Sequence, residues 1–208
     1  MDGHAFGTRC PVCMGDTRLA LRVSRDSIPD SHIDAFSSAG KEKNSALDEH
    51  HKNSNHPAVL LDNIRSAWNV GSILRSGDGF GFSHAYLCGI TPALDGPARQ
   101  AILKTSLGAE ESVPWSHHKN AVKLVKGLKK EGWKIWALEE DSRARSISEL
   151  TTPPPVHNCV LIVGNEITGV DPELLDLSDE IFHIRMQGEK RSFNVAMAFS
   201  IAAYQIQK

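Results

Sequence analysis

The sequence predicts an α/β fold with a parallel sheet that is covered by helices on both faces. Beyond Pro57, short continuous apolar runs alternate with amphipathic segments of helical period, and strands that are apolar throughout are typical of a sheet buried on both faces. The clearest strand is Cys159–Val163, an apolar run between Asn158 and Gly164. Sheets of this kind place ligands at the carboxyl ends of their strands, so the loops that follow the strands are the candidates for a site.

The elements follow one another from residue 58 to the end of the chain. Apolar runs predict strands at residues 58–61, 85–88, 134–138, 159–163 and 181–184. Helical periodicity predicts helices at residues 69–80, 120–131 and 194–207. A short helix is expected to begin at Asp171-Pro172, with Asp171 as its cap and proline in its first turn. Asn69 is the candidate cap of the first helix.

Length and composition exclude several classes of protein. The 208 residues suffice for one domain of typical size and about fifty residues more. Apolar residues make up 40% of the chain and charged residues 23%, which is typical of a globular protein. No apolar run is long enough for a membrane span, and residues 1–10 lack the apolar core of a secretory signal. The formal charge of −2 does not indicate a highly basic nucleic-acid binder, although it allows a local basic patch.

The N-terminal quarter differs from the rest of the chain. Residues 1–56 are polar with few apolar runs, which predicts a partly ordered N-terminal arm and linker ahead of a domain at residues 57–208. A short helix is expected at residues 27–34. With no export signal, the four cysteines indicate reduced thiols in a cytoplasmic protein, and Cys88 and Cys159 are expected to be buried within apolar runs.

The C-x-x-C pair formed by Cys10 and Cys13 raises the question of zinc. A closed structural site needs four ligands, and no second pair follows at zinc-ribbon spacing. His4 or His32 could contribute, but the pair alone is weak evidence, so no metal site is predicted.

Three loops after predicted strands are richer in Gly, Asn, Ser and Glu than a connection requires. They lie at residues 62–75, 164–169 and 186–195. Glu166, between two glycines at a strand's carboxyl end, is poorly explained as a plain turn residue, whereas Gly164 allows close backbone approach or a positive φ. Residues 77–81 are also glycine-rich, but they follow a helix and lack the strand–glycine–helix context of a dinucleotide-binding loop.

Together these segments resemble the SpoU (TrmH) family of RNA ribose 2′-O-methyltransferases, within the SPOUT superfamily. The opening motif matches at Asn69, Gly71 and Arg75, and residues 104–110 (KTSLGAE) look like the family's K-T-A-L-G-A-E segment. The family's G-x-E-x-x-G motif is present in residues 164–169, and its S-L-N-V-S motif corresponds to residues 192–196 (SFNVA). The resemblance covers residues 57–208. Departures from the pattern include Arg185, Phe193 and Ala196.

The resemblance implies a fold with a C-terminal trefoil knot whose loops bind S-adenosylmethionine. It also implies a homodimer, for which the apolar stripe of the last helix is the candidate face: Val195, Ala198, Phe199, Ala202 and Ile206. The cofactor-binding residues that it implies are Gly164, Asn165, Glu166, Gly169, Ile184, Met186, Ser192, Phe193 and Asn194.

The resemblance also implies the reacting group, a ribose 2′-hydroxyl of tRNA or rRNA. The catalytic residues would be Arg75, Asn69, Glu166, Ser192 and Asn194. Because a guanidinium stays protonated in proteins, Arg75 is better suited to holding a neighbouring phosphate than to acting as a general base. Candidates for further RNA contact are Arg65, Lys190 and Arg191.

Two other functions stay open from the sequence. One is an RNA-binding SPOUT relative without catalysis, which the presence of Arg75, Glu166, Ser192 and Asn194 argues against. The other is methylation of a base nitrogen, which the S-x-N-V ending and the arginine of the opening motif make the weaker alternative. The lysines at residues 119–130 are expected to be an ordinary solvated helix face.

Overall fold

A computed structural model describes residues 56–150 and 158–208 of the chain. The short helix expected at residues 27–34, the Cys10/Cys13 pair and all but the last residue of the predicted arm lie outside these described residues. Within the described residues, no helix combines the length and hydrophobicity needed to cross a bilayer.

The described residues form a seven-stranded sheet in which every paired strand is parallel to its neighbour. The strand order is β3-β2-β1-β6-β4-β7-β5. In chain order the strands are β1 (Ala58–Asp62), β2 (His84–Cys88), β3 (Trp115–His118), β4 (Lys134–Leu138), β5 (Arg145–Ser146), β6 (Cys159–Val163) and β7 (Glu180–His183). The central strands β1 and β6 are buried along their whole length, as their continuous apolar runs predict.

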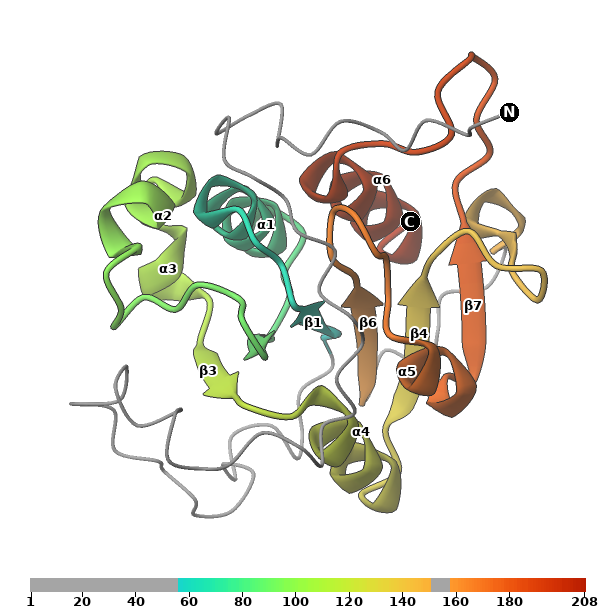
Figure 1. The fold of residues 1–208 in the computed structure, drawn as a ribbon, viewed down its shortest axis with the longest axis horizontal. Helices are drawn as coiled ribbons and strands as arrows, with labels where there is room; N and C mark the ends of the chain where they lie inside the picture. Colours follow the sequence, from blue (N-terminus) through green and yellow to red (C-terminus); the bar gives the residue numbers. More distant parts are fainter. Residues whose placement is uncertain (1–55, 151–157) are drawn as a thin grey trace, which may run out of the picture. The chain divides into compact units, whose positions relative to one another are not determined.

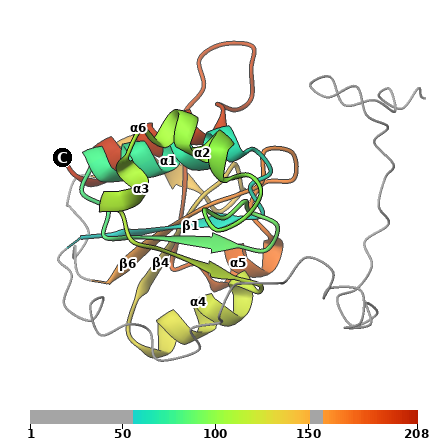
Figure 2. The same cartoon turned by 90° about the vertical axis from the view of Figure 1, so that its left-hand side faces the viewer.

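Helices cover both faces of this sheet (Figures 1 and 2). One face carries α1 (Ala67–Gly79), α2 (Arg99–Ser106), α3 (Ala109–Ser112) and α6 (Val195–Ile206). The other carries α4 (Ala121–Lys130) and α5 (Pro172–Leu177), and the 3₁₀ turn η5 (Ile147–Glu149) follows β5. The predicted α/β fold class is therefore confirmed.

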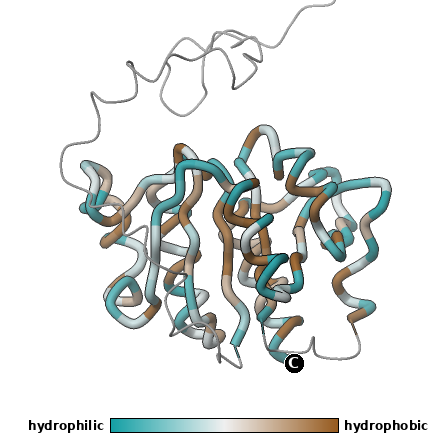
Figure 3. Tube along the Cα trace, turned by 90° about the horizontal axis from the view of Figure 1, so that it is seen from below, coloured by the Kyte–Doolittle hydropathy of each residue, from teal (hydrophilic) through white to brown (hydrophobic). Residues whose placement is uncertain are grey.

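Alternate residues of the central strands supply the two cores. Val59 and Leu61 of β1 belong to the cluster that packs on α1 and α6, whereas Ala58 and Leu60 belong to the cluster on α4 and α5. This is the period-two alternation of a strand with both faces covered. Hydrophobic residues accordingly recur along the central strands in Figure 3.

Several local predictions are confirmed and some elements were missed. Asp171 caps its helix with a side-chain oxygen, and Cys88 and Cys159 are buried, as the sequence predicts. The structure adds side-chain caps at Asn120 and Asn194. Burial raises the pKa of the Cys159 thiol to about 12. The sequence reasoning did not predict β3, β5, α2 or α3, because they are short or lie at the edge of the sheet and carry no continuous apolar run.

The expected start of α1 was wrong. Ser66, not Asn69, is the N-cap, and its side chain accepts a hydrogen bond from the Asn69 backbone N–H at 3.4 Å. The helix therefore begins two residues earlier than predicted, and the Asn69 side chain is available for contacts outside the helix.

The apolar stripe expected to form a dimer face packs instead into the chain's own core. Phe199, Ala202 and Ile206 are buried against the sheet. A different side of α6 exposes large apolar side chains, those of Met197, Ile201 and Tyr204. These three recur at the spacing of one helix face.

Helices α1 and α2 pack closely because Gly71 has no side chain. A Cβ at this position would overlap the hydroxyl of Thr105 and the backbone carbonyl of Ile102. The Thr105 hydroxyl instead donates a hydrogen bond to the carbonyl oxygen of Trp68 at 2.9 Å. Gly71 of the opening motif is thus explained by helix packing.

Candidate active site

A cavity of about 400 Å³ opens where the loops after β4, β6 and β7 meet at the carboxyl edge of the sheet. Its walls are the end of β4, the loop after β6 and the segment from His183 to Val195. All the residues that the sequence assigns to cofactor binding line this cavity: Gly164, Asn165, Glu166, Gly169, Ile184, Met186, Ser192, Phe193 and Asn194. A parallel sheet brings them together because the carboxyl ends of its strands share one edge.

Glu166 fastens the loop after β6 to the loop after β1. Its Oε2 accepts a hydrogen bond from the backbone N–H of Arg65 at 2.9 Å. Its Oε1 accepts from the backbone N–H of Ser66 at 3.0 Å and from the side-chain amide of Asn69 at 2.8 Å. These donors lie at the start of α1, where backbone N–H groups lack partners within the helix. Both carboxylate oxygens are therefore engaged in holding the first loop.

The pKa of Glu166 reflects these contacts. Burial works to raise it, but hydrogen bonds from the backbone of Arg65, the amide of Asn69 and the backbone of Ser66 outweigh burial and lower the pKa below its ordinary value. The ionised carboxylate is consequently the form that the site stabilises.

Asn69 also joins the third loop. Its Oδ1 accepts a hydrogen bond from the side-chain amide of Asn194 at 3.1 Å. Asn194 uses its own Oδ1 to cap α6 by accepting from the Ala196 backbone N–H at 2.9 Å. A chain of contacts from Glu166 through Asn69 to Asn194 thus links the three loops that the sequence singled out.

The loop after β6 is a tight turn. Asn165 and Gly169 exchange two backbone hydrogen bonds, and the Asn165 side chain accepts from the backbone of Ile167 at 2.8 Å. Gly169 has a φ of 70°, which favours glycine. Gly164 does not take a positive φ; it is needed because a Cβ there would overlap the backbone of Gly169 and Val170.

Glu139 is a site residue that the sequence reasoning missed. It lies directly after β4 and lines the cavity. Its Oε2 accepts from the Val170 backbone N–H at 2.7 Å, its Oε1 accepts from the Glu140 backbone N–H at 2.9 Å, and its carboxylate fills the space of a Cβ at Gly169. An acidic residue directly after an apolar strand was the available signal.

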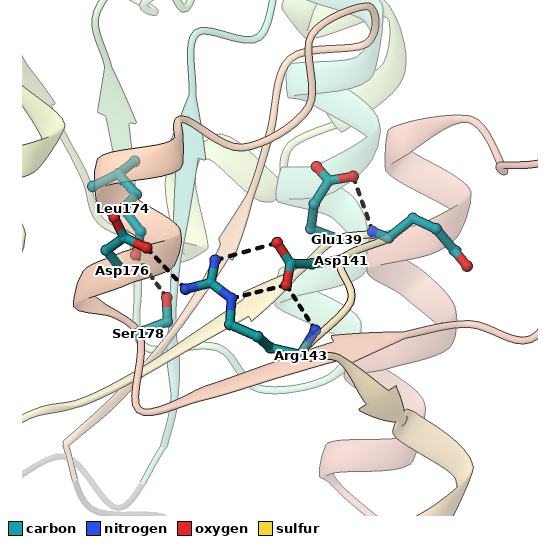
Figure 4. A network of polar contacts seen from close by, with 7 residues as sticks. Glu139, Asp141, Arg143, Leu174, Asp176 and Ser178 are labelled. Carbon is teal, nitrogen blue, oxygen red and sulfur yellow. Dashed lines mark hydrogen bonds and ion pairs between the residues drawn. The ribbon is translucent and has the colours of Figure 1, made fainter.

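The loop after β4 is tied to α5 by a second set of contacts (Figure 4). The Arg143 guanidinium donates to the Asp176 carboxylate at 2.8 Å and to Asp141 at 2.9 Å. In the same view, the Ser178 hydroxyl donates to the Leu174 carbonyl oxygen at 2.8 Å. The contact between Arg143 and Asp176 links the loop that begins at Glu139 to α5.

The basic residues divide into two groups. Arg191 lines the cavity beside Ser192, whereas Arg65, Arg75 and Lys190 are exposed and do not line it. The Arg75 side chain, exposed on α1, makes no ion pair with another described residue. The structure therefore does not bring Arg75 into the cavity beside Glu166, Ser192 and Asn194.

Two other expectations concern metals and lysines. The described part of the chain contains no group of three or more His, Cys, Asp or Glu side chains that could hold a metal ion.

The lysines of α4 lie on the face of the sheet opposite α1. Lys126 pairs with Glu173, and Lys129 pairs with Asp179. They form the solvated face that the sequence predicts.

Comparison with known proteins identifies relatives of this arrangement. The chain is 30% identical over 152 residues to the 23S rRNA (guanosine(2553)-2′-O)-methyltransferase RlmP of Bacillus subtilis, covering 72% of this chain and 57% of that protein. It is 30% identical over 152 residues to a tRNA (guanosine(18)-2′-O)-methyltransferase of Thermus thermophilus, covering 72% of this chain and 73% of the relative.

A solved structure agrees with these relatives. The TrmH/SpoU tRNA modifying enzyme of A. aeolicus superposes with a TM-score of 0.64 at 26% identity, over 76% of each chain. Residues 56–204 match the sequence model of the SpoU rRNA Methylase family. The matched residues include every strand of the sheet. The chain therefore belongs to the SpoU rRNA methylase family, as the motifs at residues 69–75 and 164–196 predict.

Proposed function

We propose that this protein transfers a methyl group from S-adenosylmethionine to a ribose 2′-hydroxyl of tRNA or rRNA. The single observation that carries the proposal is the contact chain from Glu166 through Asn69 to Asn194 at the edge of the cavity. Family membership and the names of the curated relatives, which act on guanosine 2′-hydroxyls of tRNA or 23S rRNA, support the same reaction. The chain spans only 57% of the B. subtilis relative, so its own substrate is part of the proposal.

The cavity fits the cofactor. A volume of about 400 Å³ lies within the usual range for small-molecule sites. Its walls combine the backbone of a glycine-bounded turn with apolar side chains, those of Ile184, Met186 and Phe193. When bound, S-adenosylmethionine supplies an electrophilic methyl group. The backbone of residues 164–169 and 184–194 would hold its polar parts, and the apolar side chains would pack on its nonpolar surface.

The residues around the cavity orient the nucleophile. A sugar hydroxyl reacts well only when it is positioned and its developing charge is stabilised. Ser192 and Asn194 line the cavity, and Asn69 is fixed by Glu166 on one side and Asn194 on the other. We infer that these three side chains orient the ribose, and that Glu166 is a positioning residue because both its oxygens are engaged.

Arg75 acts through the RNA backbone in this proposal. Its guanidinium is exposed on α1, outside the cavity. From there it would bind a phosphate next to the target nucleotide through two parallel hydrogen bonds, and its positive charge would favour loss of the hydroxyl proton. A phosphate oxygen or a water molecule would accept that proton. Arg65, Lys190 and Arg191 would provide further phosphate contacts.

We also propose a homodimer and a trefoil knot. The exposed apolar side of α6 supports the dimer, because Met197 and Tyr204 are 57% and 60% exposed on a helix that begins at the site. The return of the chain at Asn194 to contact Asn69 supports the knot, as does the family assignment.

The domain boundary at residue 57 and a cytoplasmic location complete the proposal. The family match begins at residue 56, which supports a methyltransferase domain at 57–208 and a separate role for residues 1–56. The proposed cytoplasmic location follows from the proposed substrate, tRNA or rRNA. A truncated chain starting at Asn55 should still bind S-adenosylmethionine by calorimetry, and a folded truncation without binding would move the boundary.

One experiment separates the three candidate functions. The purified full chain is incubated with methyl-labelled S-adenosylmethionine and, in separate reactions, with total tRNA and with rRNA. Alkaline hydrolysis should leave labelled dinucleotides, because a 2′-O-methyl group blocks cleavage at that position. Labelled mononucleotides would indicate base methylation instead. Cofactor binding without labelling of either RNA would favour a catalytically silent RNA-binding relative.

A further inference from the structure

The first turn of α1 exposes a large aromatic side chain directly beside the candidate active site. Trp68 is 54% exposed. It directly precedes Asn69, whose side chain contacts both Glu166 and Asn194. The other tryptophans, Trp115, Trp133 and Trp136, are partly or fully buried. More than half of the Trp68 surface is therefore available to a ligand.

The backbone under Trp68 is held firmly. Its carbonyl oxygen accepts a hydrogen bond from the Thr105 hydroxyl at 2.9 Å, and the cap residue Ser66 accepts from the next N–H along the helix at 3.4 Å. This turn also carries the contacts from Glu166 to the backbones of Arg65 and Ser66. The exposed indole therefore projects from a rigid surface, which lowers the entropic cost of binding a ligand there.

Two basic side chains lie on the same side of α1 as this ring or close to it. The Lys104 ammonium lies 5.8 Å from the ring centroid, a cation–π distance. Lys104 reaches it because the absence of a Cβ at Gly71 allows α2 to pack closely on α1. Arg75 lies on the same side of α1 as Trp68, two turns and about 10 Å further along the axis. Neither Lys104 nor Arg75 makes an ion pair with another described residue.

We propose that Trp68 is a stacking platform for an unpaired RNA base next to the target nucleotide, with Lys104 and Arg75 binding the adjoining phosphates. An aromatic ring flanked by cations is the arrangement that recognises single-stranded nucleic acid, since every base offers a face for stacking and every nucleotide carries a phosphate. The position beside Asn69 would hold the strand while the neighbouring ribose enters the cavity. This inference rests on the proposed function and specifies which form of RNA the site accepts.

The first test measures binding of the full chain to a 12-nucleotide single-stranded RNA and to a duplex of the same sequence. Trp68→Leu should weaken binding of the single strand by about fivefold or more, the effect of losing one stacked base, and change duplex binding little. Trp68→Tyr keeps an aromatic face and should retain most of the affinity. Lys104→Ala should reduce the slope of log binding affinity for RNA against log salt concentration by the amount expected for one lost phosphate contact. Lys123→Ala, on α4 across the sheet, should leave that slope unchanged.

The second readout is tryptophan emission. Stacking of a base on Trp68 should quench emission when the single strand is added, and this quenching should disappear in Trp68→Leu. Cofactor binding by the variant, measured by calorimetry, establishes that it is folded. Unchanged single-strand affinity and persistent quenching in Trp68→Leu would overturn the platform. So would conversion of a dimer into monomers by this substitution in sedimentation, because the indole would then be a contact between two copies of the chain.

The methylation assay separates failure of this inference from failure of the proposed function. If the full chain methylates RNA and Trp68→Leu leaves the KM for that RNA unchanged, the platform is wrong and the function stands. If single-strand binding depends on Trp68 but neither tRNA nor rRNA is methylated, the platform stands and the proposed function is wrong.

Discussion

The carboxylate of Glu166 holds the side-chain amide of Asn69 at 2.8 Å, across 97 residues of sequence. The same carboxylate holds two backbone N–H groups at the start of α1. One acidic side chain therefore fixes the position of the loop after β1 relative to the loop after β6. The contribution of these hydrogen bonds can be tested by a substitution that keeps the size of the Glu166 side chain.

Glu166→Gln should weaken the junction between the two loops. A glutamine keeps one acceptor oxygen but presents an amide nitrogen to a donor, so at least one hydrogen bond is lost, with a cost of about 1 kcal/mol. The methyl-transfer rate should fall by about tenfold or more because Asn69 is no longer held. Urea unfolding and single-turnover kinetics measure the two effects.

Glu173→Gln is the matched control. Glu173 is exposed and pairs with Lys126 on the opposite face of the sheet, so the substitution should change stability by less than about 0.5 kcal/mol and leave the rate unchanged. Equal behaviour of the two variants would contradict the role assigned to Glu166.

Arg75→Ala should separate catalysis from cofactor binding. Arg75 does not line the cavity, so the affinity for S-adenosylmethionine should stay the same. The single-turnover rate at saturating RNA and cofactor should fall by about 10²-fold, the scale of losing one positioned charged group. Arg75→Lys should restore little, because an ammonium does not form the bidentate contact of a guanidinium. Arg145→Ala removes a guanidinium on β5 that pairs with Glu180 on β7, and this variant should methylate RNA at the normal rate. A normal rate in Arg75→Ala would remove Arg75 from the reaction.

Gly71→Ala should destabilise the protein. The new methyl group would overlap Thr105 and the Ile102 carbonyl, and such overpacking typically costs about 1–3 kcal/mol. Gly127→Ala is the control, since Gly127 lies within α4 with no atom near its absent Cβ. That change should stabilise the helix by up to about 1 kcal/mol. Thermal unfolding of both variants checks the prediction. Destabilisation by both substitutions would show that steric overlap with Thr105 and Ile102 does not explain the effect at Gly71.

Stability should fall as the pH drops from about 7 to 5, in part through His118. Burial, with a smaller contribution from the charge of His117, lowers the pKa of His118 in the folded protein. Below its ordinary pKa near 6.5 the unfolded chain binds a proton that the folded chain does not, so stability is present at higher pH and decreases with acid. His118→Gln should flatten this dependence in urea unfolding at a series of pH values. An unchanged slope would show that other groups account for it.

Met197→Glu should disrupt the proposed dimer. Met197 is 57% exposed on α6, on the apolar side that also includes Ile201 and Tyr204. A carboxylate buried between two copies would be strongly unfavourable, so sedimentation should show monomers. Gln207→Glu adds the same charge beyond the end of α6 and should leave the dimer intact. Wild-type protein that is monomeric at all concentrations would contradict the dimer itself.

The sequence by itself determined the type of sheet and the edge of the sheet at which its polar loops gather. Continuous apolar runs such as Cys159–Val163 predict strands covered on both faces, and the structure has them at the predicted positions. The polar loops after those strands had to share one edge, because parallel strands end on the same side. This is why the residues assigned to cofactor binding, from Gly164 to Asn194, all line one cavity.

Only the tertiary structure decided what each polar residue contacts. Glu166 and Asn69 are 97 residues apart, and no local pattern specifies that one carboxylate accepts hydrogen bonds from the start of α1. Glu139 and its contact with Val170 depend on β4 lying next to β6, a pairing that sequence periodicity does not reveal. In α6, periodicity identifies the apolar positions but does not show which of them are buried. Only the structure shows that Phe199 lies in the core and that Met197 is exposed to solvent. Strand order and helix rotation are set by the packing of the whole chain, so they are read from the fold and not from the sequence.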